Sequence, residues 1–158
     1  MAGKRDDFLL RAIDQLRQMV AQAVKLRDSG QLEQALFAII HAQEGLFARP
    51  AQQFMTLGLD EQIRLLKLGE SPETGRGKCI GYALSLKEAG LVYEARDKPD
   101  LAQGAFQSAL YILLVIAVEN PRAAEEIKAP IVGLLERVPV EQRHPPLMDL
   151  LKQLEATY

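Results

Sequence analysis

The side chains best suited to chemistry in this 158-residue sequence are one cysteine, Cys79, and two histidines, His41 and His144. A metal site needs several Cys, His, Asp or Glu side chains at short spacing, and a nucleophilic pair needs a base held beside the thiol. None of the three residues has another Cys or His within one helical turn. We therefore predict no metal site, no cofactor and no catalytic residue, and we interpret Cys79 as a packing residue of a helix.

A second chemical hypothesis concerns the segment TGRGKC at residues 74–79. Its glycines would expose backbone N–H groups, and Arg76 and Lys78 would add positive charge just before a helix start, which favours anion binding. The P-loop spacing is absent, because Pro72 stands where the first glycine is needed and Cys79 replaces the Ser or Thr that contacts magnesium. We predict an exposed, flexible linker over residues 70–78, with anion binding as the alternative.

Composition and charge exclude other classes of function. The chain has 19 Lys and Arg against 21 Asp and Glu, a formal net charge of −2 and no Trp, so it lacks the positive field and the aromatic platforms that nucleic acids need. Six carboxylates are expected in the first turns of helices, where they would complement the helix dipole: Asp6, Asp7, Asp60, Glu61, Glu125 and Glu126. A single cysteine forms no internal disulfide. The start MAGKRDDFLL lacks the uninterrupted apolar segment of a signal peptide, and we expect a cytoplasmic protein.

The most apolar run is YILLVIAV at residues 111–118. A membrane-spanning helix needs about 20 apolar residues, and polar residues bound this run on both sides, so we predict no membrane contact. Two covers remain, which are the protein's own core and a partner subunit. The residues that point away from the preceding helix would form the oligomer face if a partner covers them: Tyr111, Leu114, Val115 and Val118.

Apolar residues recur at spacings of three and four along the whole chain, and no segment alternates with the period of a strand. We predict an all-α fold in one domain. It would hold a first helix pair over 5–50, a short degenerate helix and a loop over 51–78, a second pair over 79–120 and C-terminal capping helices over 121–158. The short middle helix would be capped by Asp60 and closed by Gly69. Asn120 and Pro121 would start the first C-terminal helix, and Pro130 would divide it.

Two stretches resemble each other at an offset of 67 residues, AVKLRDSGQLEQALFAIIHA from Ala23 and GLVYEARDKPDLAQGAFQSA from Gly90. Small residues would lie where two antiparallel helices approach, and large ones would fill the space beside them. This repeat-packing core comprises Ala23, Leu26, Ala35, Ile39 and Ala42 in the first copy and Leu86, Gly90, Tyr93, Ala102, Phe106 and Ala109 in the second.

The pattern resembles the tetratricopeptide repeat, whose period is 34 residues, over about half of the chain. The layout is also similar to a small bacterial family of tetratricopeptide-like proteins with no assigned activity. The resemblance implies a non-catalytic module that binds a protein or peptide in a groove lined by the first helix of each pair. Carried over by position, that groove would present Arg17, Val20, Val24, Arg27, Leu84, Lys87, Leu91 and Glu94.

Three basic residues of this predicted groove, Arg17, Arg27 and Lys87, would hold an acidic segment or a carboxylate. The C-terminal helices could also fill the groove. A structural homodimer, assembled through surplus apolar helix faces, is the alternative function. An enzyme is a remote alternative, because no acid-base pair or nucleophile arrangement is present in the sequence.

Overall fold

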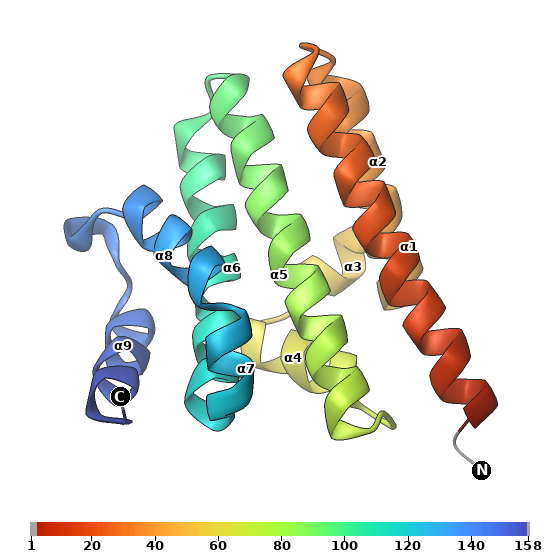
Figure 1. The fold of residues 1–158 in the computed structure, drawn as a ribbon. Helices are drawn as coiled ribbons and strands as arrows, with labels where there is room; N and C mark the ends of the chain where they lie inside the picture. Colours follow the sequence, from red (N-terminus) through yellow and green to blue (C-terminus); the bar gives the residue numbers. More distant parts are fainter. Residues whose placement is uncertain (1–2, 158) are drawn as a thin grey trace.

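The structure, a computed structural model, describes the backbone of residues 3–157 and the side chains of residue 14 and residues 16–156. Residues 5–13 of the first predicted pair lie outside the described side chains. All regular structure in this part of the chain is helical and no strand occurs in it, which confirms the all-α class. The helices are α1 (Gly3–Asp28), α2 (Leu32–Phe47), α3 (Ala51–Met55), α4 (Leu59–Lys67), α5 (Pro72–Ala95), α6 (Pro99–Glu119), α7 (Pro121–Glu126), α8 (Lys128–Arg137), a 3-10 turn (Val140–Gln142) and α9 (Pro145–Thr157) (Figure 1).

The two helix pairs, α1–α2 and α5–α6, are joined by turns with the same backbone hydrogen bonds. Gly30 closes α1 in the left-handed conformation (φ 82°), and the N–H group after it donates to the carbonyl of Leu26 over 2.8 Å. Asp97, 67 positions later, closes α5 with φ 59°, and the N–H group after it donates to the carbonyl of Tyr93 over 2.9 Å. Both turns are Schellman motifs, so the internal repeat extends from residue types to backbone geometry.

The predicted repeat-packing residues lie mostly in the interior. Leu26 and Tyr93 are half-buried, and the others are buried: Ala23, Ala35, Ile39, Ala42, Leu86, Gly90, Ala102, Phe106 and Ala109. Ala89 and Val92 of α5 join Ala23, Ala35 and Ile39 in one cluster between the pairs. The second pair therefore packs directly against the first, although 24 residues separate α2 from α5 in the chain.

Those intervening residues form the short helices α3 and α4 in place of a further pair. Helix α4 begins at Leu59 and has Gly58 at its N-cap, so the prediction that Asp60 caps this helix is wrong. The carbonyl of Gly58 already accepts the N–H of Gln62 over 3.0 Å, which places Asp60 inside the first turn. Gly69 has φ 75°, as expected for a residue that ends a helix.

The prediction of a loop over residues 70–78 is wrong for 72–78, because α5 begins at Pro72. The Ser71 hydroxyl accepts the Thr74 N–H over 3.2 Å, and proline occupies the first helical position, a combination that outweighs the glycines. Gly75 serves packing, since a Cβ there would lie 3.1 Å from Cγ of Lys67. Its N–H donates to the carbonyl of Ser71 over 2.9 Å, so it is not available to an anion.

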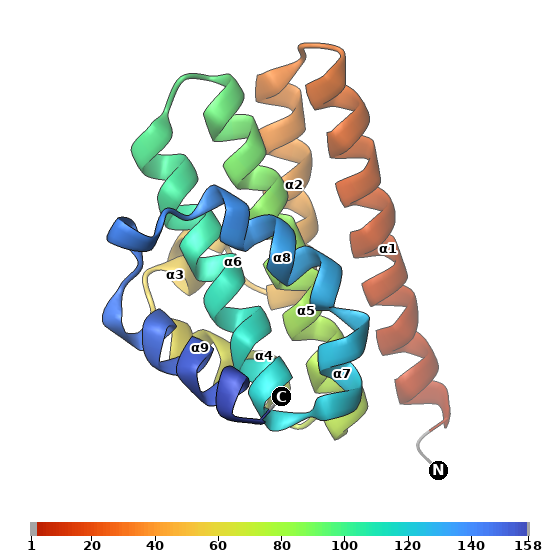
Figure 2. The same cartoon turned by 60° about the vertical axis from the view of Figure 1, so that its left-hand side comes forward.

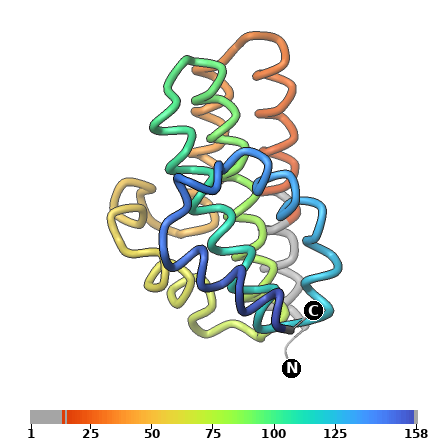
Figure 3. The backbone as a smooth tube through the Cα atoms, turned by 90° about the vertical axis from the view of Figure 1, so that its left-hand side faces the viewer, coloured from red at the N-terminus to blue at the C-terminus, as the bar shows by residue number. Residues whose placement is uncertain are grey.

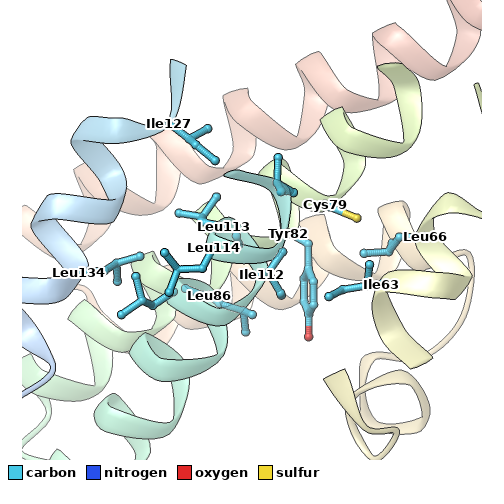
Figure 4. Packing of buried hydrophobic residues seen from close by; sticks show 14 of the residues in the cluster. Ile63, Leu66, Cys79, Tyr82, Leu86, Ile112, Leu113, Leu114, Ile127 and Leu134 are labelled. Carbon is cyan, nitrogen blue, oxygen red and sulfur yellow. The ribbon is translucent and has the colours of Figure 1, made fainter. Parts of the chain in front are cut away.

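The chain's own C-terminal helices cover α6. Figure 2 shows α8 crossing in front of α6 near its middle, with α9 along the lower part of α6 and α7 beside its lower end, and Figure 3 shows the same chain segments from another side. Leu114 is fully buried, whereas Tyr111, Val115 and Val118 are half-buried. Figure 4 shows Leu134 of α8 beside Leu114 in this cluster. Of the four residues assigned to an oligomer face, Leu114 is thus part of this chain's own core, and Tyr111 and Val115 pack against that core.

The C-terminal helices begin and break close to the residues predicted from the sequence. The Asn120 side chain accepts the Ala123 N–H over 3.1 Å at the start of α7, and Pro121 is the first residue of that helix. Two short helices, α7 and α8, meet at Ile127, three residues before Pro130. This position of the break fits proline in the first turn of a new helix.

Among the described helices, α6 has the length and apolar composition to cross a membrane. Half of its most apolar window is buried inside the structure, and the central helix of a water-soluble protein would pass the same test. The prediction that residues 111–118 are too short to span a membrane was based on eight residues, whereas the helix that contains them extends over Pro99–Glu119.

Candidate binding groove

The face predicted to bind a partner is largely engaged in contacts within the chain. Arg27 donates from Nε to Glu88 Oε1 over 2.7 Å, which ties α1 to α5. Glu94 accepts from Arg137 of α8 over 2.7 Å. Val20 and Leu91 pack against the main core. Two of the charged residues expected to meet a ligand are therefore already paired.

The remaining predicted groove residues are Arg17, Val24, Leu84 and Lys87. Arg17 is exposed, while Val24, Leu84 and Lys87 are half-buried. None of the eight predicted residues lines either of the hollows described next. The expectation that Arg17, Arg27 and Lys87 together hold an acidic segment stays a prediction without a cavity to support it.

A larger hollow opens between α2 and α6, with α5 as its floor and α3 at one end. It has a volume of about 630 Å³. Figure 1 shows α3 and α4 behind α5, on the side away from α7 and α8. Apolar side chains dominate its walls, which are formed by Leu36, Ile39, Ile40, Ala51, Met55, Leu86, Ala89, Tyr93, Leu101 and Ala105. Three large apolar side chains remain exposed here, Ile40 by 37 %, Met55 by 43 % and Leu101 by 54 %.

A second hollow, of about 460 Å³, continues along α6 between α4 and the start of α9. It shares Gly104 and Ser108 with the first hollow. Leu59, Tyr111 and Leu147 contribute apolar surface to it. We call the two hollows together the α6 groove.

Gly104 lies at the junction of the two hollows. A Cβ at this position would have no heavy atom within 4 Å, and the residue is exposed in the middle of a helix. Glycine in an exposed helix interior costs about 1 kcal/mol relative to alanine. Its absence of a side chain leaves the α6 backbone accessible from the groove.

The charged side chains that line the groove are acidic. They are Glu44 and Asp100 in the first hollow and Asp60 in the second, and neither hollow is lined by Lys or Arg. The hydroxyl of Tyr111 donates to Oδ1 of Asp60 over 2.6 Å. This hydrogen bond, with burial as a lesser cause, raises the pKa of Tyr111 to about 12.

The side chains that could take part in chemistry come from different elements: Cys79 and Tyr82 from α5, His41 from α2, and His144 from the segment before α9. Burial raises the pKa of the Cys79 thiol to about 11 and also raises the pKa of the Tyr82 hydroxyl. Buried Tyr82 donates to Oε1 of Gln62 over 2.7 Å, which is a structural role. His144 lines the second hollow and His41 lies on the outer side of α2. In the described residues, no three His, Cys, Asp or Glu side chains come together in a metal site.

Sequence reasoning missed the α6 groove as a site, although it named Ile39, Leu86 and Tyr93 as core residues and Tyr111 as part of an oligomer face. Two features of the sequence could have pointed to this groove. Leu101 and Ile40 are large apolar residues outside the predicted repeat core, and Gly104 is an isolated glycine within a helical pattern. No sequence pattern reports that α2 and α6 are held apart.

No family model matches the chain, and no curated protein or solved structure matches it either.

Proposed function

We propose that the chain is a non-catalytic interaction module that binds a peptide or a helix of a partner protein in the α6 groove. The observation that carries the proposal is the pair of adjoining hollows along α6, which share Gly104 and Ser108, and the three large apolar side chains, Ile40, Met55 and Leu101, that line the first hollow and remain exposed. Exposed apolar surface gathered around a concave site is typical of binding sites.

A tetratricopeptide-like arrangement of the two pairs is part of the proposal. Its support is the matched turns at Gly30 and Asp97 and the small residues buried between the helices. The site differs from the one that the resemblance implied. We place it between the second helices of the pairs, because Arg27 and Glu94 on the first helices are bound to Glu88 and Arg137.

The homodimer alternative has weaker support. Leu114, the centre of the face that a second subunit would need, is buried under this chain's own helices. A homodimer would have to use another surface.

Gly104→Leu provides a direct test, because it fills the groove where a Cβ meets nothing. Gly45→Leu is the matched control, since Gly45 is exposed on α2, a Cβ there also meets nothing, and it does not line the groove. A displayed library of random 18-residue peptides would be selected on the wild-type protein. We expect binders whose affinity falls at least about tenfold on Gly104→Leu and is unchanged on Gly45→Leu. A library that gives no binder, or binders indifferent to Gly104→Leu, would overturn the proposal.

A further inference from the structure

We infer that the occupant of the α6 groove is an amphipathic helix that carries one basic residue near each end of its apolar face. The inference rests on the proposed function, and it specifies the chemistry of the partner.

The charge of the groove supports a basic occupant. Glu44 is committed to the fold, because its Oε2 accepts the N–H of Ala51 over 2.9 Å. Asp100 and Asp60 are exposed and lie in different hollows. Asp60 accepts one hydrogen bond, from Tyr111, and a carboxylate has further acceptor positions. Each end of the groove therefore offers a carboxylate to a Lys or Arg side chain.

The basic residues near the α5–α6 turn do not line the groove. Arg96 lies 3.7 Å from Glu33 and is paired with it. Lys98 precedes α6 and does not line the groove. The lining keeps its acidic character.

The geometry of the walls favours a helix as the occupant. An extended peptide that binds by adding a strand to a sheet edge has no such edge here, because the described residues contain no sheet. A helix satisfies its own backbone and can lie between α2 and α6 over α5, with apolar residues at spacings of three and four facing inward.

The length of the groove sets the spacing of the two basic residues. Along α6, Asp100 marks one end, and Tyr111, which holds Asp60, marks the other. At 1.5 Å per residue these positions are about 16 Å apart. Residues 11 positions apart on a bound helix span about the same distance and share a face, so we expect Lys or Arg at about that spacing.

The test uses the peptides selected on the wild-type protein, with affinity measured by fluorescence anisotropy at about 0.05 M and about 0.5 M salt. We expect Lys or Arg at both ends of a helical apolar stripe. Asp60→Asn, which keeps an acceptor for Tyr111, and Asp100→Asn should each weaken binding about fivefold at low salt and little at high salt. Asp14→Asn, an exposed change on α1, should leave binding unchanged.

The outcomes separate the inference from the proposed function. Selected peptides with neutral or acidic ends, or binding unaffected by Asp60→Asn and Asp100→Asn, would overturn the inference, and blockade by Gly104→Leu would still support the groove as the site. No binder, or no effect of Gly104→Leu, would overturn both. Self-association of the wild type that Gly104→Leu abolishes, seen by light scattering, would make a second copy the occupant and overturn the basic helix.

Discussion

Gly90 of α5 lies directly against the ring of Phe106 of α6. A Cβ at residue 90 would be 2.4 Å from Cε1 of that ring, and Phe106 is fully buried. Because an added Cβ would overlap this buried ring, any larger residue at position 90 requires the ring or the helices to shift. The packing of α5 against α6 therefore depends on glycine at position 90.

Gly90→Ala should therefore lower the free energy of unfolding by about 1–3 kcal/mol through overpacking. Gly104→Ala on α6 should raise it by up to about 1 kcal/mol, because the Cβ meets nothing and alanine favours the helix. Urea unfolding followed by circular dichroism measures both. Phe106→Leu in the Gly90→Ala background should cost less than the two single changes add up to, and simple additivity would contradict the contact.

The left-handed turns offer a second prediction. Gly30→Ala should destabilise the protein by about 1 kcal/mol, because a side chain is strained at φ 82°. Asp97→Gly at the equivalent turn should stabilise it slightly, since φ 59° strains a non-glycine residue. Thermal and urea unfolding check both changes. Gly45→Ala, in an ordinary exposed helix position, is the control and should stabilise.

The ion pair between Arg27 and Glu88 is a third point to test. The Glu88 side chain is 8 % exposed and that of Arg27 24 %, so Arg27→Ala leaves a carboxylate in a poorly solvated site and should cost about 2–3 kcal/mol. Arg64→Ala removes an exposed pair with Glu61 and should destabilise the protein much less than Arg27→Ala, because solvent screens the exposed pair. Equal losses in urea unfolding would show that the buried pair has no special role. The double change of Arg27 and Glu88 to Met should recover much of the loss.

Cys79 makes the stability sensitive to alkaline pH. Its pKa rises from an ordinary 9.0 to about 11 because burial disfavours the thiolate. The unfolded chain thus loses its proton first as pH rises, and the free energy of unfolding falls between pH 9 and 11, by about 1 kcal/mol at pH 10 from this group. Cys79→Ala should reduce the fall between pH 8 and pH 10 in urea titrations. At pH 8, the folded protein should resist alkylation by iodoacetamide, whereas the urea-unfolded chain should react.

Leu114 tests the covering of α6 by the C-terminal helices. Leu114→Ala should destabilise the monomer by about 3 kcal/mol, because it opens a cavity under these helices. Val132→Ala, on the exposed side of α8, should change stability by less than about 1 kcal/mol. The mass of both proteins in solution should also be measured by light scattering. If the wild type is a dimer and Leu114→Ala is a folded monomer, Leu114 lies in an interface between subunits and not in the core.

The predictions from sequence succeeded where they depended on near neighbours. The apolar periodicity indicated the helices, and the residue pair Asn120 and Pro121 indicated the start of α7. They failed where two local signals competed. Around residues 70–78 the glycines suggested a loop, and Ser71 with Pro72 decided for a helix that packs Gly75 against Lys67 of α4.

The amino-acid sequence by itself determined the all-helical class, the internal repeat and the small residues between its helices, because these depend on spacings of three and four and on the size of each side chain. The tertiary structure alone decided where the chain is hollow and which charges are already paired. Glu88 lies 61 positions after Arg27, and the α6 groove exists because α5 packs against α1 and α2 while α3 and α4 fill only part of the space between α2 and α6. Such relations arise from packing between distant segments, which no local pattern contains.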